Sequence, residues 1–435
     1  MIDNLRQKYI YLDYAATTPV RPEVLELMMP YFKDQFGNAS SLHSLGIDAK
    51  KALERARTEI GESIGAQPEE IVFTSGGTEA DNLAIQGIGF ANLSRGNHII
   101  TSVIEHVAIL NTCRFMGKMG FKVTHIPVDC YGRVNPDEVK KRITSKTILI
   151  SIMHANNEIG TLQPIQEIST IAREKEIVFH TDAIQTWGKI PFDVNSLGAD
   201  ALSISGHKIY GPKGVGILYI RKGAKIRPIL WGGGHERGVR SGTENVAGIV
   251  GMAKAIKLVK DEMPIEMKRQ TDMRDRLVNG IFEKMEGVSL NGHPTERLPG
   301  HVHLSFSNLD AQKLVLALDA KGIGASMGSA CSSLHPYPSH VLREIGLSDE
   351  LALGSIRVTT GHYTTPDDIE YVLEVLPSVI EDCRKSGIDR ERRDEVLRKK
   401  ILEIQEEKGG CESIKQMAWS YIFKKTSGRI FKRGR

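Results

Sequence analysis

The strongest constraint on the fold is a regular alternation of short apolar runs, rich in β-branched residues, with longer segments of helical periodicity. Short runs of this composition are typical of buried strands. They lie at residues 71–74, 98–103, 122–128, 147–153, 177–180, 201–205 and 214–220. The helical patterns between them include residues 78–90, 136–143 and 165–175. Strands separated by helices form parallel βαβ units, so the pattern predicts an α/β fold with a mostly parallel sheet.

The pattern changes near residue 250, where residues 250–276 are expected to form one long helix or two shorter ones. Short strands and helices follow at residues 288–290, 301–306, 311–320 and 355–359, which predicts a smaller α+β domain. We expect an N-terminal segment that packs with the small domain, a large cofactor-binding domain, the small domain, and a charged, basic extension. These four parts are residues 1–15, 16–260, 261–388 and 389–435.

The composition favours a globular protein with more than one domain, because 435 residues exceed one ordinary core. The net charge of +4 is too small to predict nucleic acid or membrane binding. No apolar stretch approaches the roughly 20 residues of a membrane span, and the first residues lack the apolar core of a secretory signal. Five cysteines without a Cys-x-x-Cys pair argue against a disulfide framework or zinc ribbon, and favour a reducing cytoplasm.

Polar residues follow four of the predicted strands, at residues 75–78, 156–158, 181–185 and 206–208. Ligands of open parallel sheets bind at the carboxyl ends of the strands, so these residues are expected to share one crevice. The segment 74–82 has the pattern of a strand, a Gly-rich turn and a helix. Its helix N-terminus suits a phosphate, although a plain βα turn capped by Thr78 is the simpler interpretation.

Lys208 and Asp182 are candidates for the chemistry of an aldehyde cofactor. Lys208 lies among glycines that allow close approach to a ligand, and a lysine there suits a covalent bond to the aldehyde. Asp182 can hold the proton of a pyridine nitrogen, with Gln185 near the ring hydroxyl. His106 is suited to stack on the ring or move a proton. A solvated lysine, a helix-capping aspartate and a structural histidine are the plain alternatives, and the local sequence does not decide between them.

A metal site is a further interpretation of several of these residues, but they lack the spacing of helical metal ligands, which disfavours zinc hydrolase chemistry. The residues concerned are His106, His154, His180, Asp182 and His207.

Cys331 lies in a run of small residues, 324–333, that is unsuited to a core and predicts an exposed loop. An exposed thiolate is a candidate nucleophile, whereas Cys113 and Cys130 are expected to be structural. Arg357 follows a predicted strand and suits an amino acid carboxylate, a surface salt bridge being the alternative. The basic, Gly-rich loop 232–243 is a candidate for another anion contact.

Together these motifs resemble the cysteine desulfurase family, within the class V aminotransferase-like pyridoxal phosphate enzymes. The resemblance extends from Tyr11 to about residue 385, with the motifs in family order. The motifs are residues 11–19, 37–43, 74–79, 156–160, 182–185, 205–208, 237–243 and 328–333, together with Arg357. The family's fold is the pyridoxal phosphate aminotransferase-like fold (fold type I), which has a mostly parallel large-domain sheet and a smaller α+β domain.

The resemblance also implies residue roles. Lys208 would bond the cofactor, Asp182 would pair with the ring nitrogen, and His106 would stack on the ring. The ring-hydroxyl contacts would be Gln185 and Asn157, and the phosphate contacts would be Gly77, Thr78, Ser205 and His207. Thr243 would reach the phosphate of the neighbouring subunit, which implies a homodimer. Arg357, with Asn157, would bind the substrate carboxylate.

By the same resemblance, Cys331 would take sulfur from L-cysteine as a persulfide and release alanine. Iron–sulfur cluster assembly is the usual destination, and the short loop around Cys331 is the form tied to scaffold proteins. In some family members this cysteine serves as a ligand of the cluster. The resemblance therefore also implies that Cys331 is a transient iron–sulfur ligand. Lys208 would move the proton at the substrate's α-carbon.

Two departures and three alternatives accompany this resemblance. The loop after Cys331 has more proline and an added Tyr337, and residues 390–435 extend beyond the usual end. That basic, aromatic tail is a candidate for docking a partner, RNA or anionic lipid, or is a weakly ordered tail. The alternative functions are a selenocysteine lyase or cysteine sulfinate desulfinase, a non-catalytic scaffold homologue, and a nucleic-acid-binding protein through the tail alone.

Overall fold

The computed structural model describes residues 9–328 and 338–385. The chain divides into two compact units, Met1–Ile380 and Glu381–Arg435. All elements described below belong to the first unit, apart from the end of the last helix. Cys331 and the predicted extension 389–435 lie outside the described residues, and the predicted domain boundaries stay predictions.

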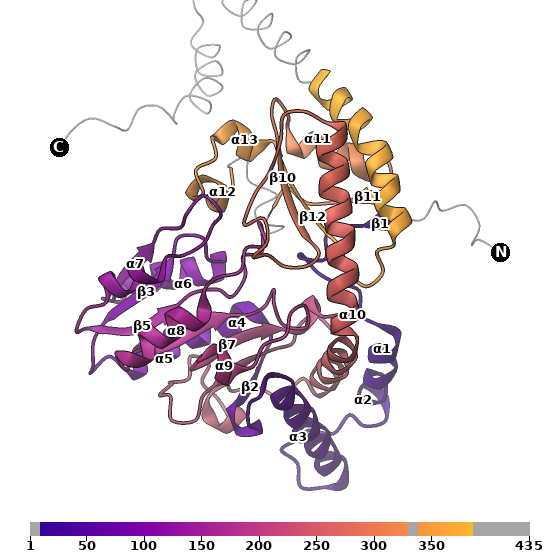
Figure 1. The fold of residues 1–435 in the computed structure, drawn as a ribbon. Coiled ribbons are helices and arrows are strands. Elements are labelled where there is room, and N and C mark those ends of the chain that lie inside the picture. Colours follow the sequence, from indigo (N-terminus) through magenta and orange to yellow (C-terminus); the bar gives the residue numbers. More distant parts are fainter. Residues whose placement is uncertain (1–8, 329–337, 386–435) are drawn as a thin grey trace, which may run out of the picture. The chain divides into compact units, whose positions relative to one another are not determined.

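A seven-stranded sheet lies at the centre of the larger part of the fold (Figure 1). All its pairs are parallel except those of β8, which is antiparallel to both neighbours because it follows β7 after a short connection. This confirms the predicted mostly parallel sheet. In spatial order the strands are β2 (Ile71–Thr74), β8 (Gly216–Ile220), β7 (Ala201–Ser205), β6 (Val178–Asp182), β5 (Thr147–Ser151), β3 (His98–Ser102) and β4 (Lys122–Ile126).

Helices cover both faces of this sheet, and alternate side chains of each strand enter different cores. Phe179 of β6 packs with residues of α3 (Ser44–Ile64), whereas its neighbour Val178 packs with the core under α6 (Val107–Lys118). The other helical elements of this part are α1 (Pro22–Met28), α2 (Pro30–Lys33), η1 (Pro68–Glu70), α4 (Gly77–Asn82), the π-helical η2 (Leu83–Gly87), α5 (Ile88–Ala91), α7 (Pro136–Arg142), α8 (Ile165–Glu174), α9 (Val194–Leu197), η3 (Gly206–Lys208) and η4 (Glu236–Gly238).

The smaller sheet is antiparallel, in the order β12-β10-β9. Its strands are β9 (Val288–Leu290), β10 (His301–Phe306) and β12 (Ser355–Thr359). Near it, β1 (Ile10–Tyr11) pairs in parallel with β11 (Ile323–Gly324), which brings the start of the chain beside its last third. The remaining helices are α11 (Ala311–Asp319), α12 (His340–Glu344), α13 (Asp349–Leu353) and the helix at residues 366–385.

A single helix, α10 (Val246–Lys284), links the two sheets and is continuous although it contains Pro264. It packs on α3 and also contacts β10. The sequence had left open whether this stretch is one helix or two, and the structure shows one. Over the described residues, no helix combines the length and apolar character that a membrane span requires.

A buried ion pair fixes the Gly-rich loop 232–243 against the large sheet. The Arg57 guanidinium of α3 donates two bonds of 2.8 Å to the Glu236 carboxylate, and both side chains are almost fully buried. Arg57 also donates to the carbonyl of Ile71, and Glu236 accepts from the amide of Phe73. The loop that carries Thr243 is therefore anchored at the start of β2.

We predict that Arg57→Leu lowers the free energy of unfolding by about 3–5 kcal/mol, because it leaves the Glu236 carboxylate buried without its partner. Urea unfolding followed by tryptophan fluorescence measures the change. The control is Arg276→Leu, which removes an exposed ion pair with Glu370 and should have little effect. Equal losses in the two variants would contradict the structural role of the Arg57–Glu236 pair.

Candidate functional site

The polar residues that follow four strands meet at one edge of the large sheet, as predicted. β5, β6 and β7 are adjacent and parallel, and β2 runs in the same direction on the far side of β8. Their carboxyl ends therefore point the same way. At this edge lie Asn157 after β5, Asp182 at the end of β6, Lys208 after β7, and Gly77 after β2.

Lys208 is bound by the N-terminal segment and is not the solvated loop lysine of the plain alternative. Its ammonium donates to the carbonyls of Ala15 and Ala16, both at 2.7 Å. The same segment continues along the lysine's own loop, because the amide and hydroxyl of Thr18 both donate to the carbonyl of His207 at 3.0 Å. Lys208 thus has a defined position at the strand ends.

Asp182 is buried at the end of β6, and one of its oxygens accepts a 2.9 Å bond from the amide of Ile184. No helix begins there, so the helix-cap alternative is wrong, although the bond to a following amide is of that type. Burial raises the pKa of Asp182 to about 6, and the positive charge of Lys208 opposes this rise. The carboxylate therefore lies near a cation and remains ionised at neutral pH.

Two further buried carboxyl groups lie near Asp182, and neither was predicted from the sequence. Asp81 of α4 is fully buried, with its carboxylate 3.9 Å from the Nε2 of His180, and burial raises its pKa well above its usual range. Glu105 accepts bonds from the Ser102 hydroxyl and the Met153 amide, and burial raises its pKa to about 8. At neutral pH Glu105 is therefore mainly protonated, whereas Asp182 is mainly ionised.

His106 is the N-cap of α6, where its Nδ1 accepts a 3.2 Å bond from the amide of Ala108. Burial, together with the charge of Lys208, lowers the pKa of His106 to about 4. The imidazole is therefore neutral at physiological pH. The bond to Ala108 gives His106 a structural role, as the plain alternative expected. A neutral ring beside Lys208 is also compatible with stacking on a bound aromatic ligand.

Gln185 belongs to a hydrogen-bonded chain that ends at Lys208. Its amide nitrogen donates to the carbonyl of Ala15 at 3.0 Å, the same carbonyl that accepts from Lys208. Its amide oxygen accepts a 2.9 Å bond from Lys189. Because a protonated lysine can only donate, Lys189 in its charged form fixes which end of the Gln185 amide faces the site. Burial, followed by the charges of Lys208 and Arg357, lowers the pKa of Lys189 to about 7. Sequence reasoning missed Lys189, whose only signal is its position four residues after Gln185.

The predicted phosphate residues lie around the start of α4. Gly77 is the first residue of that helix, and a Cβ there would lie 2.1 Å from Ile184 and 3.6 Å from Ser205. Only glycine therefore allows α4 to start so close to the strand ends. His207 bonds the hydroxyl of Thr17 at 3.1 Å, and burial lowers its pKa to about 4. Thr78 is exposed in the first turn of α4.

Arg357 is fully buried on β12, so the surface salt-bridge alternative is wrong. Its guanidinium donates to the Asp13 carboxylate at 2.7 Å and to the carbonyl of Asn157 at 2.8 Å. Its Nε has no hydrogen-bond partner within the part of the chain that the structure describes. Arg357 therefore joins the small sheet to the N-terminal segment and to the loop after β5. Asp13 belongs to the motif 11–19, but its bond to Arg357 was not predicted from the sequence.

Other predicted residues lie apart from this cluster or outside the described residues. Thr243 is exposed on the loop that Glu236 anchors, and its predicted contact is with another subunit. Cys331 is not described. Cys113 is buried, whereas Cys130 is exposed on a turn, so its assignment to an ordinary structural element was wrong. Residues 9–328 and 338–385 contain no group of three His, Cys, Asp or Glu side chains arranged to hold a metal ion.

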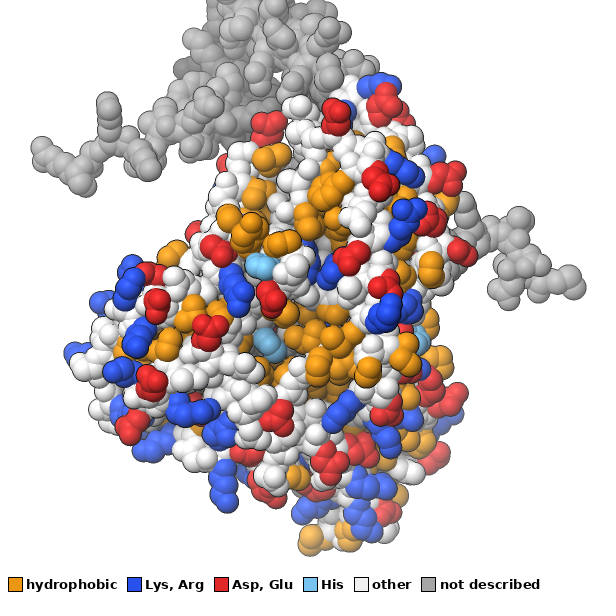
Figure 2. Space-filling view, in the orientation of Figure 1, with side chains coloured by type: hydrophobic (Ala, Val, Ile, Leu, Met, Phe, Trp, Pro, Cys, Tyr) orange, Lys and Arg blue, Asp and Glu red, His pale blue; other side chains and the backbone are white. Residues whose placement is uncertain are grey.

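A surface pocket is lined by a different set of residues from this site. Its lining includes Trp187, Phe192, Ile256, Met263 and Pro264, and none of the predicted site residues. Figure 2 shows that hydrophobic side chains gather near the middle of one face, while charged side chains are spread around them. The lining also contains Glu62, Asp193 and Lys260, but it includes none of the residues that meet at the strand ends, so we assign the chemistry to the strand ends.

The chain matches the family model described as aminotransferase class-V over residues 10–372. It is 53% identical over 378 residues to a protein named cysteine desulfurase IscS from Dictyoglomus turgidum, which covers 87% of this chain and 96% of that protein. It is 52% identical over 377 residues to a protein of the same name from Methanosarcina thermophila, with 87% and 93% covered.

Solved structures agree with these relatives. A structure titled NifS-like protein superposes with a TM-score of 0.81 at 39% identity, covering 86% of this chain and 99% of that one. A structure titled SspA in complex with cysteine gives a TM-score of 0.73 at 39% identity, with 82% and 100% covered. These matches confirm the fold type I architecture. The chain therefore belongs to the cysteine desulfurase family, within the class V aminotransferases, whose members depend on pyridoxal phosphate.

Proposed function

We propose that this cysteine desulfurase binds pyridoxal 5′-phosphate at Lys208, takes sulfur from L-cysteine and leaves it as a persulfide on Cys331. The observation that carries the proposal is the convergence of Lys208, Asp182 and Arg357 at one edge of the sheet. A lysine amine, an ionised carboxylate and a buried guanidinium are the groups that an aldehyde cofactor and an amino acid require.

The residues at this edge fit pyridoxal phosphate. Asp182 uses one carboxylate oxygen for the Ile184 amide, and the other has no protein hydrogen bond within the described residues, so it is available to a protonated ring nitrogen. A Cβ at Gly77 would meet the Ile184 side chain, so glycine lets the first turn of α4, whose amides suit a phosphate, lie beside the strand ends. The proposed contacts are Lys208 for the aldehyde, His106 for the ring face, Gln185 and Asn157 for the ring hydroxyl, and Gly77, Thr78, Ser205 and His207 for the phosphate.

When bound, the cofactor's protonated ring withdraws electrons from the α-carbon of the attached amino acid. Asp182 keeps the ring nitrogen protonated, because an ionised carboxylate in a buried site favours a cation beside it. The Lys208 amine moves the proton at the α-carbon. Arg357 binds the substrate carboxylate, and its bonds to Asp13 and Asn157 hold the guanidinium in place while Nε remains for a ligand.

Sulfur transfer uses the Cys331 thiolate as nucleophile. A bond forms between the two sulfur atoms, the bond from the substrate's β-carbon to sulfur breaks, and its electron pair stays with the carbon. A proton then completes the methyl group of alanine. L-Cysteine and the Cys331 thiol become L-alanine and a persulfide, so no external oxidant or reductant is needed.

The persulfide is proposed to supply iron–sulfur cluster assembly through a scaffold or other acceptor protein, in the cytoplasm. Membership of the cysteine desulfurase family supports the role in cluster assembly. The cysteine pattern, which lacks a Cys-x-x-Cys pair, supports a reducing compartment. We propose a homodimer in which Thr243 contacts the cofactor phosphate of the neighbouring subunit. Its support is the exposure of Thr243 on a loop held rigidly by the Arg57–Glu236 pair.

The proposed reaction predicts that the purified protein releases alanine from L-cysteine, in molar excess over protein, when a reductant is present. Cys331→Ala should abolish this release, because the sulfur acceptor is gone, while the exposed Cys130→Ala control should keep it. Chromatographic quantitation of alanine measures both. Release that survives in Cys331→Ala would show that another group is the nucleophile. Release from cysteine sulfinate or selenocysteine, but not from L-cysteine, would favour the alternative activities.

The burial of Asp182 predicts a trade-off between stability and cofactor binding. Its folded-state pKa is raised from 3.8 to about 6, so the folded state binds more protons in that window, and stability falls as the pH rises through it. Above pH 6 the buried carboxylate is ionised, and it lowers the free energy of unfolding by about 3 kcal/mol. Asp182→Asn removes this cost, and its amide oxygen still accepts from Ile184. The cofactor-free variant should therefore be more stable than the unchanged protein at pH 8, and the gain should shrink toward pH 5.

Urea unfolding of the cofactor-free proteins at the two pH values measures the gain, and fluorescence titration with pyridoxal phosphate measures affinity, which should fall in Asp182→Asn. A variant that is less stable by the same amount at both pH values would contradict the assigned burial cost. Unchanged cofactor affinity would contradict the pairing of Asp182 with the ring nitrogen.

A further inference from the structure

Tyr210 connects the loop that carries Lys208 to the turn that follows the strand of Arg357. Tyr210 lies two residues after Lys208, and its hydroxyl accepts a 2.7 Å bond from the backbone amide of His362. His362 lies five residues after Arg357, just beyond β12. One side-chain hydrogen bond therefore joins two short segments, and each segment leads to one of the groups proposed to hold the substrate.

The backbone of Tyr210 is held in a conformation that directs this side chain. Its φ angle is +65°, in the left-handed region that residues other than glycine seldom adopt. Its amide donates to the Thr18 hydroxyl at 2.7 Å, and its carbonyl accepts from the amide of Arg21 at 3.1 Å. Such a conformation persists only where the surroundings determine it, so the direction of the Tyr210 ring is fixed by its neighbours.

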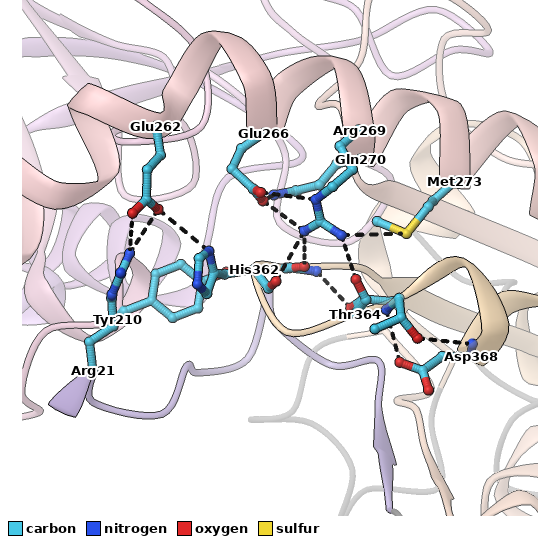
Figure 3. Close-up of polar contacts among 12 residues, drawn as sticks. Arg21, Tyr210, Glu262, Glu266, Arg269, Gln270, Met273, His362, Thr364 and Asp368 are labelled. Atoms are coloured by element: carbon cyan, nitrogen blue, oxygen red, sulfur yellow. Dashed lines mark hydrogen bonds and ion pairs between the residues drawn. The ribbon is translucent and has the colours of Figure 1, made fainter.

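The turn on the other side of the bond is held by α10. The Arg269 guanidinium donates to the carbonyls of Gly361 at 2.8 Å and His362 at 3.1 Å, and also to that of Thr364. Glu266 accepts from Arg269 at 2.8 Å and keeps its guanidinium in place. Figure 3 shows Arg269 and Glu266 on α10, with His362 and Thr364 of the turn beneath the helix. The amide of His362 is therefore presented to Tyr210 by a turn whose carbonyls are already bound.

Ring contacts and an ion pair complete the same junction. The Tyr210 ring lies 5.9 Å from the His362 ring and 6.1 Å from that of Tyr14, measured between centroids. Glu262 of α10 accepts from Arg21 at 2.7 Å and lies 3.4 Å from Nδ1 of His362. The junction therefore ties the N-terminal segment, the Lys208 loop, α10 and the turn after β12 together.

We propose that Tyr210 is a positioning residue that sets the separation between Lys208 and Arg357, and thereby the fit of the substrate carboxylate. The inference deepens the proposed function and rests on the roles given there to Lys208 and Arg357. A misplacement of about 1 Å in a binding group is enough to weaken a productive complex, so a bond that fixes two segments acts on substrate binding without contacting substrate. Tyr210 is expected to leave the cofactor contacts unchanged, because the Lys208 loop keeps its bonds to Thr18 and Ala15.

The test is Tyr210→Phe, which removes the hydroxyl and keeps the ring. The KM for L-cysteine should rise about fivefold, the change expected if the freed turn weakens the contact of Arg357 with the substrate carboxylate by about 1 kcal/mol, while kcat and pyridoxal phosphate affinity change little. The matched control is Tyr219→Phe, because Tyr219 is fully buried and its hydroxyl has no hydrogen-bond partner in the described structure. It should change none of these quantities.

Hydrogen exchange of the His362 amide gives a second readout that does not depend on activity. Its exchange should be faster in Tyr210→Phe than in the unchanged protein and in Tyr219→Phe, because the acceptor of that amide is removed. An unchanged KM in Tyr210→Phe, or a loss of cofactor affinity that accompanies the KM change, would overturn the positioning role. A failure of the proposed function would instead appear as an absence of alanine release from the unchanged protein. The two kinds of failure are therefore distinguishable.

Discussion

The candidate site depends on a set of hydrogen bonds between the N-terminal segment 13–21 and the carboxyl ends of the central strands. Ala15 is the centre of this set, because its carbonyl accepts from both Lys208 and Gln185. The segment also extends to the small sheet, where Asp13 binds the buried guanidinium of Arg357. One short segment, which turns at residues 14–16, thus places the amine end and the carboxylate end of the proposed substrate site relative to each other. The further contacts of the segment are Thr17 with His207, Thr18 with Tyr210, and Arg21 with Glu262.

Burial decides the charges at the site. Among the buried carboxyl groups at the strand ends, Asp182 is the one whose rise in pKa is opposed by the charge of Lys208. Burial raises the pKa of Glu105 to about 8, so this group keeps its proton at neutral pH, and burial also raises the pKa of Asp81 well above its usual range. His106 is neutral for the same reason of burial. The site therefore carries one ionised carboxylate beside its lysine, the arrangement that a pyridine ring with a protonated nitrogen requires.

Features that depend on a local sequence pattern, such as the strands and the edge of the sheet where the site lies, were predicted from the sequence. The bounds of β2, β7, β9, β10 and β12 are those expected from the apolar runs, and the polar residues after four strands share one edge because parallel strands end on the same side. Partners brought together from distant segments were not predicted. The bonds of Asp13 to Arg357 and of Tyr210 to His362 join residues far apart along the chain, so no local pattern predicts them. The helix α3 was missed because its buried positions are mostly alanine and glycine, which weaken the apolar period.

Borohydride reduction of the cofactor-loaded protein, followed by peptide mass mapping, tests the central claim most directly. The reagent makes permanent the bond between a lysine nitrogen and the cofactor aldehyde. The arrangement at the strand ends predicts that the label lies on Lys208 alone, and that it is lost in Lys208→Ala. A label on Lys189, the other buried lysine at this edge, or no label on protein that has bound the cofactor, would contradict the assignment of the site.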